Sequence, residues 1–238
     1  GDYAQAQKNF KRLLDDKKTP KSLKNICENY DVRIDYYLGK YDQFLQKAPA
    51  LMRDETAVFK KDDLQEMMGE VYFNRGEYGE ALKYYRASSA SQQPGCTAAD
   101  NAYQIGYCHY MLSHYDSAAV YLSRKTSCND SVAQNALYTL GDTYVKLGRK
   151  AEARSMFRQA SEMDFNAKIK EDALFNYAKL SCELNQNAYN ESIKSFENYL
   201  TKYPKTKHRS EIQQILTGLY FTTRNYKDAL TLIEREKK

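Results

Sequence analysis

One pattern recurs along this chain of 238 residues: an aromatic residue, usually tyrosine, stands three positions before a small residue. The small positions follow one another at intervals of 35 to 39 residues, so one unit is copied about six and a half times. Repeats of this length bury their apolar faces against the neighbouring copies. The chain is therefore expected to form a stack of repeats. The pairs are Tyr3/Ala6, Tyr78/Ala81, Tyr115/Ala118, Tyr189/Ser192 and Tyr226/Ala229, with Tyr41/Phe44 and Lys150/Ala153 as imperfect copies.

The best preserved copy, residues 62–85, predicts two antiparallel helices. Apolar residues recur at helical spacing before Gly76 and again after Tyr78, and the glycine marks a turn between them. Two long first helices are expected at residues 22–38 and 168–184. In the copy around Tyr41, Pro49 is expected to cut the second helix short, because proline removes a backbone donor and clashes with the preceding turn.

Seven of the ten glycines occupy two positions of the repeat. Gly69, Gly106 and Gly141 lie in the middle of the first helix, where glycine costs roughly 1 kcal/mol relative to alanine. Their presence predicts that the two helices of a hairpin approach closely, with the small residue of the second helix facing the glycine. The other four lie at the turn, and these are Gly1, Gly39, Gly76 and Gly148.

This arrangement resembles the tetratricopeptide repeat family, whose signature has Leu-Gly and Tyr on the first helix and Ala, an aromatic residue and Ala on the second. The resemblance covers nearly the whole chain and implies an all-α, right-handed α-α superhelix of about six helix-turn-helix repeats. It implies one elongated domain over residues 1–238. Since the sequence starts within a repeat and ends without a capping helix, we expect a fragment of a longer protein. The fullest match is Leu140, Gly141, Tyr144, Gly148, Ala153, Phe157 and Ala160.

The composition is ordinary for a soluble protein, whereas the missing motifs argue against an enzyme. The chain is 42% hydrophobic and 28% charged, and no apolar run approaches the length of a membrane span. It has no phosphate-binding loop, nucleophile motif or zinc pattern, so no catalytic residue, cofactor or metal is expected.

Cys96 and Cys128 lie at successive inter-repeat turns, which a regular stack would hold ~10 Å apart. That distance is too long for a disulfide, so all five cysteines are expected to be thiols.

In the tetratricopeptide family the first helices line a concave groove that holds a peptide or a helix of a protein partner. Tyr103, Tyr107 and Tyr110 share one helical face, and tyrosine combines a large apolar ring with a hydrogen-bonding tip. These tyrosines either line the groove or pack against the next repeat. The resemblance places the following partner-binding residues in the groove: Tyr36, Phe73, Asn74, Tyr103, Tyr107, Tyr110, Met111, Tyr138, Asp142, Phe175 and Lys179.

Two local comparisons refine the expected partner and compartment. Glu66 and Glu70 stand where chaperone-binding members of the family carry a Lys and Asn clamp, so an adaptor for chaperone tails is disfavoured. Residues 196–208 are similar to a linker in bacterial envelope tetratricopeptide proteins, including the outer-membrane assembly lipoprotein and periplasmic cell-division coordinator groups. This similarity favours the bacterial periplasm or outer membrane, with the cytoplasm as the alternative.

The leading functional hypothesis is a non-catalytic scaffold that binds a peptide or protein in the concave groove, in the assembly of the cell envelope. A second hypothesis is a polymer-binding module that stacks tyrosines on a glycan or on single-stranded nucleic acid. Nucleic acid is disfavoured because no pair of polar, base-reading positions repeats along the chain. A third hypothesis is an architectural spacer without a ligand.

Overall fold

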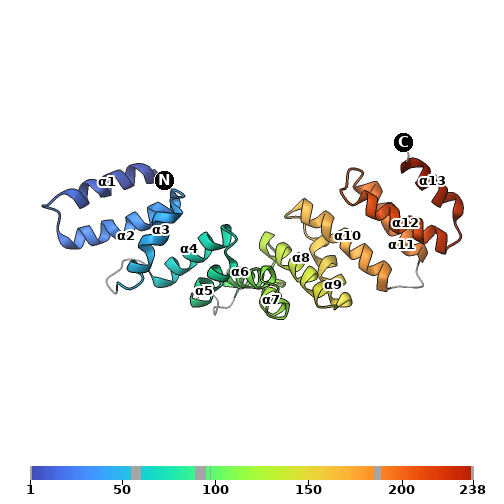
Figure 1. The fold of residues 1–238 in the computed structure, drawn as a ribbon, viewed down its shortest axis with the longest axis horizontal. Coiled ribbons are helices and arrows are strands. Elements are labelled where there is room, and N and C mark those ends of the chain that lie inside the picture. The colour runs from blue at the N-terminus through green and yellow to red at the C-terminus, as the bar shows by residue number, and fades with distance from the viewer. Residues whose placement is uncertain (1, 55–59, 89–94, 97, 185–188, 237–238) are drawn as a thin grey trace. The chain divides into compact units, whose positions relative to one another are not determined.

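The computed structural model describes residues 2–54, 60–88, 95–96, 98–184 and 189–236, and within these ranges every regular element is a helix. The chain divides into two compact units, Gly1–Ser113 and His114–Lys238. The expectation of a single elongated domain stays a prediction. The first unit holds α1 (Tyr3–Asp15), α2 (Lys21–Tyr37), α3 (Tyr41–Leu51), α4 (Lys61–Asn74), α5 (Tyr78–Ala87) and α6 (Ala98–Met111) (Figure 1). The second unit holds α7 (Tyr115–Leu122), the 3-10 turn η2 (Ser123–Lys125), α8 (Ser131–Lys146), α9 (Lys150–Glu162), α10 (Ala167–Leu184), α11 (Tyr189–Lys202), α12 (Arg209–Thr222) and α13 (Tyr226–Glu236).

The helix boundaries follow the repeat pattern. Every second helix begins at the first residue of an aromatic-to-small pair, as α5 does at Tyr78 and α9 at Lys150. The two long first helices, α2 and α10, begin and end within one residue of their predicted bounds. Successive helices such as α1 and α2, or α8 and α9, pack against each other within their unit (Figure 1). The predicted all-α array of helix hairpins is therefore confirmed.

The turn inside each hairpin explains the glycines found there. Gly76 has φ of +76°, and the N–H of the next residue, Glu77, donates to the carbonyl oxygen of Tyr72 at 2.9 Å. This left-handed conformation with its returning hydrogen bond closes the end of a helix, and glycine adopts it without a steric penalty. The corresponding positions hold Gly39 (φ +71°), Ser113 (φ +61°), Gly148 (φ +73°) and Arg224 (φ +60°).

The mid-helix glycines are covered by aromatic rings of the second helix. A Cβ added to Gly69 would lie 2.7 Å from Cε1 of Tyr85, and one added to Gly141 would lie 2.9 Å from Cδ1 of Phe157. Each ring stands four residues after the small residue of its pair, so both share one helical face. Close approach is confirmed at these two glycines, but the ring, rather than the small residue, occupies the space over each glycine.

Buried apolar side chains from successive helices form the core of each unit. In the first unit, Phe44 of α3 and Leu64 of α4 are fully buried in one cluster. The expectation for Pro49 needs correction, because this proline lies inside α3, which continues for two more residues to Leu51. So close to the C-terminal end of a helix, a proline removes only one of the last intrahelical hydrogen bonds.

The cysteines differ from expectation at two positions. Cys96 and Cys128 are disulfide-bonded, so the interpretation of both as thiols is wrong. That interpretation applied the spacing between helix axes to residues in loops, whose positions helix packing does not fix. Cys27 and Cys108 are buried free thiols and Cys182 is a half-buried one. Burial raises the pKa of the Cys108 thiol to about 12, which keeps it protonated and unreactive.

None of the helices in the described ranges combines the length and the apolar composition needed to cross a bilayer.

Candidate partner-binding surface

A row of tyrosines runs along α6 in the first unit. The ring centroids of Tyr103 and Tyr107 lie 5.9 Å apart, and those of Tyr107 and Tyr110 lie 6.2 Å apart. All three side chains are half-buried. The helix places them on one side because residues four and three positions apart project in nearly the same direction. The three rings therefore form a continuous row along α6.

The row continues onto the preceding repeat. Tyr107 lies 5.4 Å from Phe73 of α4 and 6.1 Å from Tyr78 of α5, measured between ring centroids. Phe73 and Tyr78 are themselves 5.7 Å apart and nearly perpendicular. Such edge-to-face pairs add roughly 0.5–1.5 kcal/mol each beyond the area they bury. We call this cluster the aromatic face, and it consists of Phe73, Tyr78, Tyr103, Tyr107 and Tyr110.

The tyrosines were expected either to line the groove or to pack against the next repeat, and Tyr107 combines packing with partial exposure. It packs on Phe73 and Tyr78 of the neighbouring repeat, and it is still only half-buried. Burial raises the pKa of Tyr103 to about 12, with a further contribution from Tyr107. Burial and the neighbouring Tyr78 also raise the pKa of Tyr107. Both hydroxyls therefore stay neutral at physiological pH and can donate and accept hydrogen bonds.

Two carboxylates lie on the same helix as Phe73. Glu66 accepts a hydrogen bond from Oγ of Ser88 at 2.9 Å, and Glu70 accepts one from the hydroxyl of Tyr36 in α2. Burial, followed by the hydrogen bond to Glu70 and its charge, raises the pKa of Tyr36 well above the usual range. The half-buried Tyr36 also packs at 5.4 Å on the buried ring of Phe44. Tyr36 is thereby fixed beside α4.

Two further predicted residues lie at helix ends in the first unit. Asn74 is the last residue of α4 and is exposed. Met111 is the last residue of α6, with 43% of its surface exposed. Together, α2, α4 and α6 of the first unit carry seven of the predicted partner-binding residues. Their role in binding stays a prediction.

The remaining predicted residues belong to the second unit, on α8 and α10. Tyr138 is half-buried against Phe157, with ring centroids 5.5 Å apart. Burial and the charges of Asp172 and Asp142 raise its pKa. Asp142 is half-buried on the same helix as Tyr138.

Phe175 and Lys179 of α10 are engaged within the second unit. Phe175 is only 3% exposed and stacks on the imidazole of His208, with ring centroids 4.0 Å apart. The ammonium of Lys179 lies 2.6 Å from Glu211 of α12. A partner would therefore meet the Lys179–Glu211 ion pair rather than an isolated charge, and Phe175 lies beneath the surface.

Sequence reasoning missed two features of this region. Tyr78 was expected only at the turn of its hairpin, yet it is part of the aromatic face. No role was predicted for His208, whereas its ring packs on Phe175 and its Nε2 lies 2.8 Å from a carboxylate oxygen of Asp172. Its place in the linker-like segment, residues 196–208, was the available signal.

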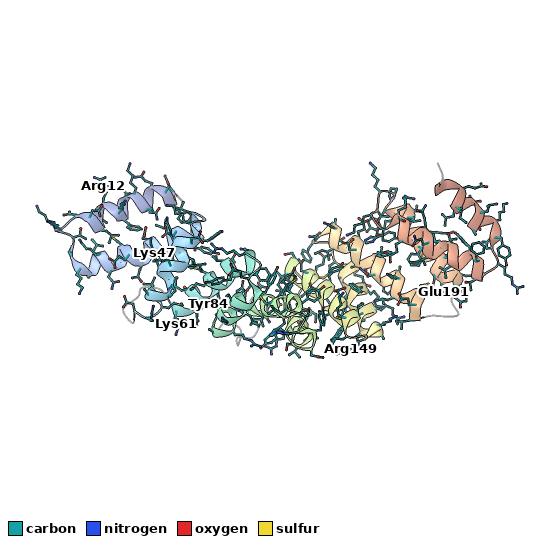
Figure 2. The ribbon with its side chains drawn as sticks, viewed as in Figure 1. Arg12, Lys47, Lys61, Tyr84, Arg149 and Glu191 are labelled. Atoms are coloured by element: carbon teal, nitrogen blue, oxygen red, sulfur yellow. The ribbon has the colours of Figure 1, made fainter. Side chains whose placement is uncertain are left out.

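Ion pairs elsewhere in the first unit join α2 to α3. Lys47 of α3, labelled in Figure 2, pairs with Asp31 at 2.7 Å and with Asp35 at 2.6 Å, both on α2. Asp35 is fully buried, so its part in this arrangement is structural. Among the residues that the structure describes, no group of three or more His, Cys, Asp or Glu side chains is placed to hold a metal ion.

Comparisons with known proteins agree with this architecture. A sequence model of the tetratricopeptide repeat family matches residues 138–205. The C-terminal part of a repeat-containing protein from Cytophaga hutchinsonii superposes with a TM-score of 0.71 at 19% identity, covering 97% of this chain and 87% of that one. The chain is similar to tetratricopeptide repeat proteins.

Two further solved structures extend the likeness. A tetratricopeptide repeat protein from Parabacteroides merdae has a TM-score of 0.56 at 20% identity, covering 96% of this chain and 78% of that one. The protein YrrB, described as a tetratricopeptide protein with an unusual peptide-binding site, has a TM-score of 0.60 at 18% identity, covering 84% and 94%. No curated protein matches the chain. The family match and these structures support the resemblance to the tetratricopeptide repeat family. The predicted all-α solenoid fold is confirmed.

Proposed function

We propose that this tetratricopeptide array is a non-catalytic scaffold that binds an extended peptide or a helix of a protein partner on the aromatic face of its first unit. The observation that carries the proposal is the row of half-buried rings from Tyr103 to Tyr110, continued by Phe73 and Tyr78. Interlocked aromatic rings are already ordered before binding, so little conformational entropy is lost when a partner docks. The peptide-binding site described for YrrB supports this choice of ligand.

We place this function in the bacterial cell envelope. The disulfide-bonded state of Cys96 and Cys128 supports an oxidising compartment such as the periplasm, because disulfides rarely persist in the cytosol. The similarity of residues 196–208 to the linker of envelope tetratricopeptide proteins points the same way. A role in envelope assembly follows as the working hypothesis.

Site-specific photo-cross-linking in the native cell tests the binding surface. A photo-reactive amino acid replaces Tyr110, and a matched control replaces Val120, which is 57% exposed on α7. We expect one protein to be cross-linked at position 110 in clear excess over position 120, identified by mass spectrometry. Equal cross-linking from both positions, or cross-links only to glycan or nucleic acid, would contradict the proposal.

Binding of the identified partner to purified protein then gives a quantitative test. The Tyr110→Ser/Met111→Ser variant changes residues at the accessible end of α6 and avoids Tyr107, which packs on two neighbouring rings. We expect about a tenfold loss of affinity, typical of removing interfacial aromatic contacts. Phe165→Ser is the matched control, since Phe165 is a 50% exposed aromatic residue of the second unit. A control variant that loses as much affinity would show nonspecific apolar binding.

A further inference from the structure

The repeat formed by α10 and α11 has serine at two positions where other repeats have large side chains. Ser181 of α10 stands three residues after the position that glycine holds in the best preserved copies. Ser195 of α11 stands three residues after the small residue of its aromatic-to-small pair. The same two positions hold the following pairs in four other repeats: Tyr72 and Tyr84, His109 and Tyr121, Tyr144 and Met156, and Tyr220 and Leu232.

The paired large side chains fill space between the two helices of a hairpin. In the first unit, the rings of Tyr72 and Tyr84 stack with their centroids 5.5 Å apart. Two serine side chains are too short to fill the same space. The repeat of α10 and α11 has a cavity of about 200 Å³, which is lined by both Ser181 and Ser195. The cavity therefore follows from the sequence of this repeat.

Side chains from three helices of the second unit line this cavity. Arg154 belongs to α9, Tyr177 to α10 and Glu191 to the first turn of α11, where Figure 2 labels it. Ser192, beside Glu191 on α11, is also part of the wall. Because α10 packs against both α9 and α11, these polar groups converge on one small volume.

Two groups of this wall have no partner within the described part of the chain. Ser192 is only 8% exposed, and its hydroxyl makes no hydrogen bond to a described residue. The guanidinium of Arg154 is half-buried and makes no hydrogen bond or ion pair with a described residue. Buried polar groups are normally hydrogen-bonded, because leaving them unpaired costs stability. A buried hydroxyl on the wall of a cavity therefore indicates a ligand that supplies the missing bond.

The charges on the wall favour a neutral ligand with hydroxyl groups. Arg154 can only donate hydrogen bonds, Glu191 as a carboxylate can only accept them, and a serine hydroxyl does both. A phosphate would be repelled by Glu191, and an ammonium group would be repelled by Arg154. The hydroxyl groups of a sugar donate and accept, so they suit every polar group of this wall. Tyr177 adds a half-buried aromatic ring, which can contact the apolar side of a sugar.

A second cavity of about 180 Å³ continues the first along the same two helices. The two cavities share Ala178 of α10 and Ser195 of α11. The second adds Asn198 and Lys202, which follow Ser195 at intervals of three and four residues and so lie on the same side of α11. Each cavity has room for about six water molecules at ~30 Å³ each, which is close to the volume of one sugar ring with its hydroxyl groups.

We propose that these two cavities between α10 and α11 bind a glycan through two successive sugar rings. The first ring makes hydrogen bonds to Arg154, Glu191 and Ser192, and the second makes them to Asn198 and Lys202. An extended peptide suits the site less well, because its groups point to alternate sides of a line, whereas the polar groups here converge from three helices. The inference goes beyond the proposed function, because it concerns a different ligand and only side chains of the second unit.

Titrations of the whole chain followed by two-dimensional amide NMR test the site. The probes are maltose, cellobiose, lactose and diacetylchitobiose, each compared with its monosaccharides, together with inorganic phosphate and trialanine. We expect saturable shifts in α10 and α11 with at least one disaccharide. That disaccharide should bind about tenfold more tightly than its monosaccharides, because the second ring adds the contacts of the second cavity.

Ser195→Leu fills the space that both cavities share, with the side chain that Leu232 provides at the same position of another repeat. Affinity for the disaccharide should fall by about tenfold or more, and the melting temperature should stay equal or rise because a cavity is filled. The matched control is Ser210→Leu, since Ser210 is exposed on α12 and lines neither cavity. An equal loss of affinity in this control would show a general effect of the added apolar group and refute the site.

Arg154→Gln tests the wall without filling the cavity. Arg154 has no partner in the described part of the chain, so the fold should tolerate the change. Affinity for the disaccharide should fall about threefold to tenfold, because a hydrogen bond from a charged donor is lost. Unchanged affinity in both Arg154→Gln and Ser195→Leu would place the sugar elsewhere and overturn the proposal.

The absence of saturable binding by all four disaccharides overturns the glycan site. Binding of phosphate or trialanine that Ser195→Leu removes would assign the cavities to another class of ligand and overturn it as well. Cross-linking at position 110 concerns the first unit, so neither result affects the proposed function.

Discussion

The contact between Gly141 and the ring of Phe157 can be tested with two alanine substitutions in the second unit. Gly141 and Gly218 both lie inside first helices, α8 and α12. A Cβ added to Gly141 would meet the ring of Phe157 at 2.9 Å, whereas one added to Gly218 would meet no atom of the described residues within 4 Å. Both sites are therefore inside a helix, and they differ in packing.

Both substitutions gain the same intrinsic helix stability, roughly 1 kcal/mol for replacing glycine by alanine. Gly218→Ala should therefore raise the free energy of unfolding by about that amount. At Gly141 the new methyl group must displace a ring that is 1% exposed and also packs against Tyr138. Overpacking of a core typically costs about 1–3 kcal/mol, so Gly141→Ala should be neutral or destabilising by up to about 2 kcal/mol. The difference between the two variants should be about 1–3 kcal/mol.

Urea denaturation followed by circular dichroism measures this difference on the whole chain. Phe157→Leu supplies a further control, because a smaller side chain leaves room for the methyl group. In that background Gly141→Ala should be less harmful by about 1 kcal/mol, which is the coupling expected of residues in contact. Equal stabilisation by Gly141→Ala and Gly218→Ala would show that the ring of Phe157 does not require a glycine at position 141.

Arg224 has φ of +60°, a left-handed conformation that costs a residue with a side chain about 1 kcal/mol more than glycine. Arg224→Gly should therefore raise the free energy of unfolding by about that amount in urea denaturation. A loss of stability would contradict strain at this turn. Burial opposes ionisation of Asp172, but hydrogen bonds from two basic neighbours, one of them His208, outweigh it and lower its pKa. The resulting stabilisation is present above the unfolded value of about 3.9 and is lost as pH falls through the folded value. Asp172→Asn should therefore lower the melting temperature at neutral pH and have little effect in strong acid; an equal effect at both would contradict this linkage. Asp130 caps α8, and its carboxylate lies 2.7 Å from the ammonium of Lys125, which is 1% exposed. Asp130→Ala should therefore lower the free energy of unfolding by about 2–4 kcal/mol, and Asp130→Asn, which keeps a capping oxygen, by clearly less. Equal losses for the two variants in urea denaturation would show that the cap does not contribute to stability.

Residues close in sequence account for the parts of the fold that were predicted most accurately. The position of Tyr78 after Gly76 predicted where α5 begins, because a left-handed turn and a helix start depend on neighbouring residues alone. The row of Tyr103, Tyr107 and Tyr110 was predicted for the same reason, since helical spacing alone places these residues on one side of α6. Pro49 was misjudged although its effect is local, because its distance from the end of α3 decides how much it disturbs the helix.

Residues far apart in sequence decided the rest. Tyr36 and Glu70 are 34 residues apart, and only the packing of α2 beside α4 brings the hydroxyl to the carboxylate. Phe175 looked accessible on its helix, but the ring of His208, brought over it by α12 and the preceding loop, buries it.

The sequence by itself determined the repeat length, the hairpin turns and the helices that carry the tyrosines, since these follow from backbone preferences and helical periodicity. Only the tertiary structure decided that rings rather than small residues cover Gly69 and Gly141, and that the hydroxyl of Tyr36 donates to Glu70. The physical reason is that burial and hydrogen bonding depend on which helices meet and at what distance. A repeating pattern fixes the spacing along the chain but not those contacts.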